Sequence, residues 1–157
     1  MTLRGWIVGL SFACASIPLA LAQSGPERPS GDQQYVPQLS DIMNSVQTRH
    51  IKLWLSGKAQ NWDLARFELS RLRTSLADAA LLYSGIPVSN VTTLGTSLQS
   101  IGEAIDAKDG KRFAASFDGL TDGCNACHGS MSRGFIVIRR PTEQPFGNQL
   151  FAPQGKR

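Results

Sequence analysis

Apolar residues recur at three- and four-residue steps through most of the chain, which is the spacing of an amphipathic helix. The first such segment covers about residues 39–55, and Gly57 follows it as the expected stop. Asn61 is a favourable N-cap for a second helix, which the turn-forming residues 84–87 end. The inward stripes of these two helices are predicted to contain Leu39, Met43, Val46, His50, Leu53, Trp54, Trp62, Ala65, Leu69, Leu72, Leu76, Ala80 and Tyr83.

Two further helices are predicted in the second half of the chain. A third covers about residues 91–107, with weak helix formers near its start. A fourth begins at about Lys111, after the turn Asp109-Gly110, and runs into the segment 124–128. Their inward stripes are predicted to contain Leu94, Leu98, Ile101, Ile105, Phe113, Phe117, Leu120, Cys124 and Cys127.

Four amphipathic helices with short connections predict an all-α fold, an antiparallel four-helix bundle over residues 38–133. The short apolar and β-branched run 135–138 is the exception to the helical pattern. Residues 134–157 are too apolar for disorder alone. We expect them to form an extended C-terminal tail that packs back on the bundle.

The N-terminus has the pattern of a secretory signal peptide. Arg4 precedes an apolar stretch over residues 6–19, and Ala20-Leu21-Ala22 has the small-x-small form of a cleavage site. We expect a signal peptide over residues 1–22 and a flexible, polar leader over residues 23–37. An uncleaved membrane anchor is the alternative. The pattern predicts a periplasmic protein without a stable membrane anchor.

The segment Cys124-Asn125-Ala126-Cys127-His128 reads C-x-x-C-H, the attachment signature of a c-type haem. Two thiols three residues apart lie on one side of a helical turn, where each can add to one porphyrin vinyl group. His128 then lies beside the ring and can ligate the iron. The third cysteine, Cys14, is predicted to leave with the signal peptide. The sequence therefore predicts one covalent haem c with an iron centre.

Two other interpretations of the cysteines fit less well. A thioredoxin-like C-x-x-C opens a helix, whereas this motif ends one, where the helix dipole disfavours a thiolate. Structural zinc sites use four Cys or His ligands, and the chain has only His50 and His128 beside these cysteines.

The ligand on the other side of the iron is open. In an antiparallel bundle the end of the fourth helix lies beside the start of the first, which favours Met43 as the distal ligand. A thioether ligand raises the reduction potential. His50 is the alternative ligand, seven residues or about 10 Å further along the same helix. The structural alternatives are a core methionine that fills a gap at Met43 and, at His50, a core or haem-edge histidine hydrogen-bonded to a propionate or to the backbone.

Aromatic and basic residues surround the motif in sequence. Phenylalanines at 113, 117 and 135 are expected to line the core or the haem pocket rather than to form an electron path. The basic residues that are candidates for pairing with haem propionates, or for a solvated surface, are Arg133, Arg139 and Arg140.

The net charge of +4 is spread along the chain. This mild basicity favours an acidic redox partner protein. Nucleic acid is not expected as a partner, because no basic stripe with interleaved aromatic residues is present.

Over residues 39–133 the arrangement resembles the class II c-type cytochromes, the cytochrome c′ group and its low-spin relatives. In that family the C-x-x-C-H motif lies near the end of the fourth helix, as Cys124, Cys127 and His128 do here. Low-spin members carry a methionine early in the first helix, a position that Met43 matches. Bundles of this family often pair through their first two helices, so a homodimer is among the partners that the resemblance implies.

Two features depart from the family pattern. The chain continues to residue 157, well beyond the motif, and Arg49-His50 lies on or beside the inward stripe of the first helix. The expected function is single-electron transfer through the haem. The alternative is a five-coordinate haem protein that binds nitric oxide or carbon monoxide. An enzyme such as a peroxidase is not expected, because no distal acid–base set other than His50 is visible.

Overall fold

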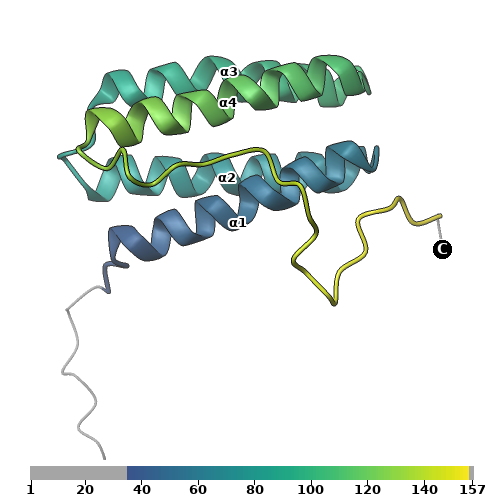
Figure 1. Ribbon diagram of the computed structural model, residues 1–157, viewed down its shortest axis with the longest axis horizontal. Helices are drawn as coiled ribbons and strands as arrows, with labels where there is room; N and C mark the ends of the chain where they lie inside the picture. The colour runs from purple at the N-terminus through teal and green to yellow at the C-terminus, as the bar shows by residue number, and fades with distance from the viewer. Residues whose placement is uncertain (1–34, 156–157) are drawn as a thin grey trace, which may run out of the picture. The chain divides into compact units, whose positions relative to one another are not determined.

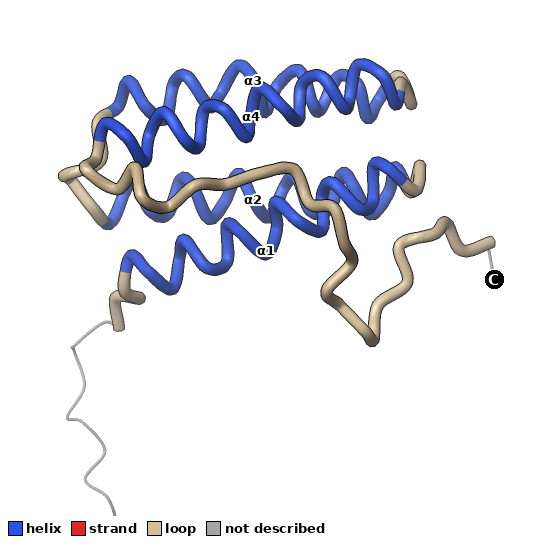
Figure 2. Tube along the Cα trace, in the orientation of Figure 1, coloured by secondary structure: helices blue, strands red, loops and turns tan. Residues whose placement is uncertain are grey.

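The computed structural model describes residues 35–155. The expected signal peptide over residues 1–22 and all but the last three residues of the expected leader lie outside this part of the chain. The described residues form four α-helices: α1 (Leu39–Lys58), α2 (Trp62–Leu82), α3 (Val88–Asp106) and α4 (Gly110–Ser130). Short turns join them into the predicted all-α antiparallel bundle (Figures 1 and 2). No helix within residues 35–155 is long and apolar enough to cross a membrane.

The helices pack mainly as two pairs, α1 with α2 and α3 with α4, and contacts between α2 and α3 and between α1 and α4 complete the bundle. All four helices contribute to one hydrophobic core, as the periodicity predicts. Its buried members are Leu53, Trp54, Ala65, Leu69, Leu72, Leu94, Leu98, Ile101, Ala104, Ile105, Phe113, Phe117 and Leu120.

The first helix is longer than predicted, and Gly57 does not stop it. Gly57 is buried inside α1, where an added Cβ would lie 2.2 Å from ring atoms of Phe113 on α4. The glycine is needed because the two helices approach closely at this point. The helix ends instead through Gln60, whose φ of 57° is the left-handed conformation common after a helix end.

The other helix ends follow local chemistry. Asn61 caps α2 as predicted, because its side-chain Oδ1 accepts a hydrogen bond from the Leu64 amide at 3.3 Å. Asp109 caps α4 in the same way. Helix α3 begins at Val88, directly after Pro87 and three residues earlier than predicted. The residues near its start are weak helix formers, and packing of the rest of the helix stabilises them in the helical conformation.

The tail after α4 is extended and lies against the bundle, as predicted. Figure 1 shows it leaving the end of α4 and running back along α4 and α1. Within this described stretch the apolar run 135–138 forms no strand. Further along, the tail buries Phe151, and Asn61 at the start of α2 donates a hydrogen bond to the Ala152 carbonyl oxygen at 3.4 Å.

Candidate cofactor site

The C-x-x-C-H motif occupies the last two turns of α4. Cys124 and Cys127 are both free thiols and both are half-buried. They continue the inward stripe of α4, and Cys124 packs directly against the hydrophobic core. The structure therefore places two reactive sulfur atoms at the inner side of the helix end, as the periodicity predicts.

His128 is held by the tail. Its Nδ1 lies 2.8 Å from the carbonyl oxygen of Ile136. A carbonyl only accepts, so Nδ1 carries the proton and donates it. In the neutral ring, the second nitrogen, Nε2, then carries the lone pair. Metal-binding histidines commonly have this arrangement, in which a hydrogen bond at one nitrogen orients the other toward the metal.

Helix α3 braces the motif from one side. The amide of Asn90, near the start of α3, donates to the Cys127 Sγ at 3.5 Å and to the Ser130 Oγ at 2.9 Å. One turn earlier, an added Cβ at Gly123 would lie 2.9 Å from a methyl group of Leu94. These contacts fix the last turns of α4 against α3.

The Cys124 thiol is poorly suited to thiol–disulfide chemistry. Burial, and to a smaller extent the neighbouring Cys127, raise the pKa of Cys124 to about 11. Reactive C-x-x-C cysteines have a lowered pKa, because the thiolate is the nucleophile. The environment of Cys124 is therefore the opposite of the one that a nucleophilic cysteine of such a motif requires.

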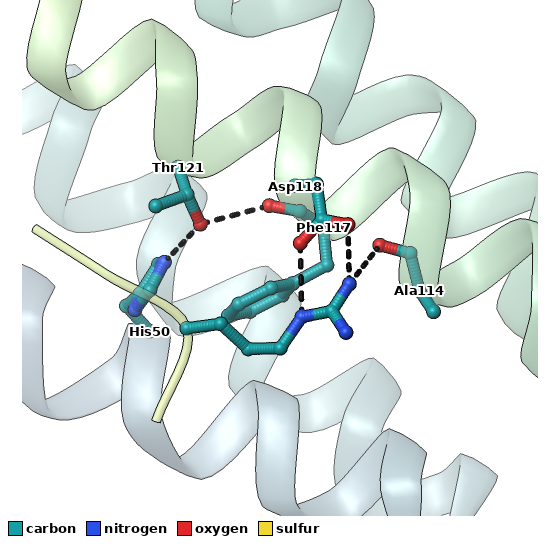
Figure 3. A network of polar contacts seen from close by, with 6 residues as sticks. His50, Ala114, Phe117, Asp118 and Thr121 are labelled. Carbon is teal, nitrogen blue, oxygen red and sulfur yellow. Dashed lines mark hydrogen bonds and ion pairs between the residues drawn. The ribbon is translucent and has the colours of Figure 1, made fainter. Parts of the chain in front are cut away.

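His50 lies deep in the bundle, 2% exposed, with its ring centroid 4.4 Å from that of Phe117. Its Nε2 is 2.9 Å from the Thr121 hydroxyl on α4. That hydroxyl donates its only proton to the Phe117 carbonyl oxygen, so His50 Nε2 must be the donor to it (Figure 3). Burial lowers the pKa of His50 to about 4, so the ring is neutral at neutral pH.

The His50–Thr121 contact fixes the register of α1 against α4. Met43 lies seven residues before His50 on α1, and His128 lies seven residues after Thr121 on α4. Because the helices are antiparallel and rise equally per residue, this register sets Met43 level with His128. His50 lies about 10 Å deeper, so the structure does not bring it beside His128.

The candidate propionate partners divide into two groups. Arg140 is already engaged: it pairs with Asp118, donates a hydrogen bond to the Ala114 carbonyl oxygen at 3.4 Å, and lies 4.4 Å from the ring centroid of Trp54. Arg133 and Arg139 are exposed.

The three candidate aromatic residues differ in their burial. Phe113 and Phe117 belong to the core, whereas Phe135 is 80% exposed on the tail.

Large apolar side chains are exposed at the end of the bundle where the motif lies. This end comprises the start of α1, the end of α2, the start of α3 and the end of α4. The Tyr83 hydroxyl donates to the Pro37 carbonyl oxygen at 2.8 Å and joins the end of α2 to the segment before α1. The exposed apolar residues here are Tyr35, Val36, Leu81, Leu82, Phe135, Ile136 and Val137. Exposed apolar side chains that gather at one end of a fold often mark a surface that binds a ligand or another protein.

These residues fit a covalent haem. Attachment needs two thiols on one helical turn, which Cys124 and Cys127 supply. Iron ligation needs an imidazole with a free, oriented nitrogen, which the Nδ1 hydrogen bond of His128 provides. A porphyrin also needs apolar surroundings, and these are exposed at the same end of the bundle. A bare metal ion fits less well, because residues 35–155 contain no cluster of three or more His, Cys, Asp or Glu side chains.

Sequence reasoning missed the polar residues that support the site. Thr121, Asn90 and Asn125 look like ordinary polar positions on a helix, and each acts through a partner far away in sequence. Asn125 had one weak signal, because it is a polar side chain between two cysteines of an inward stripe.

Comparison with protein-family models, curated proteins and solved structures finds no match for this chain. The chain has an all-helical, four-helix fold, and the residues of the candidate site are what indicate a function.

Proposed function

We propose that this chain is a periplasmic monohaem c-type cytochrome that transfers single electrons. Cys124 and Cys127 would hold the haem through thioether bonds, and His128 would be the proximal iron ligand. The observation that carries the proposal is the 2.8 Å hydrogen bond from His128 Nδ1 to the Ile136 carbonyl, beside two half-buried free thiols.

The protein contributes binding, orientation and shielding. Helix α4 presents the sulfur atoms, α3 braces them through Asn90, and the tail fixes the plane of the His128 ring. When bound, the haem supplies reversible one-electron chemistry at its iron. The resemblance to class II c-type cytochromes over residues 39–133 and the expected signal peptide support the same assignment, because c-type haem is attached outside the cytoplasm.

Met43 is the best candidate for the distal ligand. It is level with His128 in the α1–α4 register and partly buried, whereas His50 is engaged with Thr121. Methionine ligation would give a six-coordinate, low-spin haem, which suits an electron carrier because its geometry changes little with oxidation state. If Met43 does not bind, the iron is five-coordinate and the protein is a binder of nitric oxide or carbon monoxide.

The direct test is an optical spectrum of the protein purified from a host that exports proteins and attaches haem c. We expect sharp, split α and β bands on reduction and no change on addition of carbon monoxide. Cys124→Ala and Cys127→Ala should each impair covalent attachment. Cys14→Ala is the matched control, because this cysteine is predicted to leave with the signal peptide, and it should keep the haem.

Two results would change the proposal. A high-spin spectrum that shifts with carbon monoxide would replace electron transfer by gas binding. Absence of haem from the wild-type protein in that host would reject both functions.

A further inference from the structure

The tail is joined to α4 through the side chain of Asn125. The Asn125 Nδ2 donates to the Ile138 carbonyl oxygen at 2.9 Å, and the Ile138 amide donates to the Asn125 Oδ1 at 2.8 Å. One side-chain amide thus satisfies both backbone groups of one tail residue. Such a two-point contact fixes the tail in direction as well as in position. Asn125 is one of the two residues between the cysteines of the motif, and haem attachment does not use its side chain.

The same stretch of tail supplies the partner of His128. Ile136 lies two residues before Ile138, and its carbonyl oxygen accepts the proton of His128 Nδ1. The Ile136 amide donates to the Arg133 carbonyl oxygen at 2.8 Å, which closes a turn after α4. The Ile136 peptide is therefore held between that turn and the Asn125 contact. Beyond it, Arg140 fastens the tail to α4 through Asp118.

We propose that Asn125 is a positioning residue for the proximal histidine. By holding the tail at Ile138, it keeps the Ile136 carbonyl on His128 Nδ1 and thereby sets the reduction potential of the centre. The effect on potential rests on the proposed function, whereas the contact of Asn125 with the tail does not.

The physical basis is the polarity of the imidazole ring. A carbonyl that accepts the Nδ1 proton raises the electron density and basicity of Nε2. A more basic ligand stabilises the oxidised iron over the reduced iron and lowers the reduction potential. Releasing the tail removes this contribution, so the potential should rise. The C-terminal extension, which departs from the class II pattern, would then be a part of the redox site.

The test uses Asn125→Ala in the full-length, haem-containing protein, with Asn148→Ala as the matched control on an exposed position of the tail. Trypsin should cleave after the exposed Arg139 about tenfold faster in Asn125→Ala, because two hydrogen bonds are lost. The redox equilibrium should shift about tenfold toward the reduced form, a rise in potential of about 59 mV for a one-electron couple. Asn148→Ala should change neither quantity.

A second variant tests the contact from the other side. Ile138→Pro removes the amide that donates to Asn125 Oδ1 and leaves the C-x-x-C-H segment intact, so it serves if Asn125→Ala impairs haem attachment. It should also raise the potential. A tail that is released while the potential stays unchanged or falls would overturn the inference but not the proposed function. Lack of haem in the wild-type protein would reject the function, and the trypsin comparison would still test the contact.

Discussion

The two ends of the bundle are built differently. At the end where α1 finishes and α4 begins, Gly57 allows the helices to touch, and Phe113 packs with Trp54 and Trp62 at ring-centroid distances of 6.2 and 6.0 Å. We call this the closed end. At the motif end, Cys124 is only half-buried, and large apolar side chains such as that of Phe135 face outward.

The difference agrees with the proposed function, in which the closed end serves stability and the motif end would hold a haem. At the closed end the buried ring of Phe113 packs against Trp54 and Trp62, although Phe67 near the start of α2 is 54% exposed. At the motif end more apolar side chains are exposed and both thiols are only half-buried, although the same helices and the same periodicity run through both ends. The proposed haem at the motif end would account for both features.

The largest expected effect on stability comes from comparing the truncation of one phenylalanine at each end of the bundle. Phe113→Ala removes a fully buried ring at the closed end and should lower the free energy of unfolding by about 4 kcal/mol. Phe135→Ala removes an exposed ring and should change it by less than about 0.5 kcal/mol. Urea denaturation measures both. Equal costs for the two variants would contradict the division of the bundle into these two ends.

The buried His50, between the two ends, should make stability depend on pH. Its folded pKa of about 4 lies below the unfolded value of 6.5, so protonation favours the unfolded state. The stabilisation is complete above pH 6.5 and is lost as the pH falls toward 4, by roughly 3 kcal/mol in total. Denaturation curves between pH 4 and pH 7 should show this loss, and His50→Leu should flatten it. An unchanged pH profile in His50→Leu would show that His50 is not the group responsible.

A smaller effect distinguishes two glycines within helices. Gly57→Ala forces a Cβ into the Phe113 ring and should destabilise the protein by about 2 kcal/mol. Gly95→Ala, at an open position of α3, should stabilise it by about 0.5–1 kcal/mol through helix propensity. Thermal unfolding of the two variants gives opposite shifts if the closed end is as tight as described. A stabilising Gly57→Ala would mean that α1 and α4 do not touch there.

The smallest change in stability, but a clear spectral one, is expected from Met43→Ala. This residue is only partly buried, so the cost should stay below about 2 kcal/mol. The haem should nevertheless convert to high spin, because its distal ligand is lost. Met131→Ala is the matched control and should keep the low-spin spectrum, as should His50→Leu. Conversion by His50→Leu instead would assign the distal position to His50.

Much of the fold could be predicted from local patterns. The inward residues Leu94, Leu98, Ile101 and Ile105 of α3 are all buried as their spacing predicts. The prediction that Gly57 ends the first helix was wrong, because the sequence alone does not distinguish a glycine that ends a helix from one that lets a neighbouring ring approach. Only the identity of the residue opposite, Phe113, distinguishes them, and that pairing is a tertiary one.

The candidate site, too, could be predicted from the sequence only in part. The two cysteines and His128 could be found because their chemistry depends on spacing within a single helical turn. The supporting contacts could not, because Asn125 meets Ile138 and His50 meets Thr121 across long sequence separations. The tautomer of His50 depends in turn on where the Thr121 hydroxyl points, which only the packed structure fixes.

The central claim, that a haem occupies the motif end through Cys124 and Cys127, is tested most directly by the intact mass of the exported protein under denaturing conditions. We expect the mass of the polypeptide plus one haem. The added mass should remain after denaturation and should be absent when both cysteines are replaced by alanine. A wild-type mass without haem, from a host shown to mature another c-type cytochrome, would contradict it.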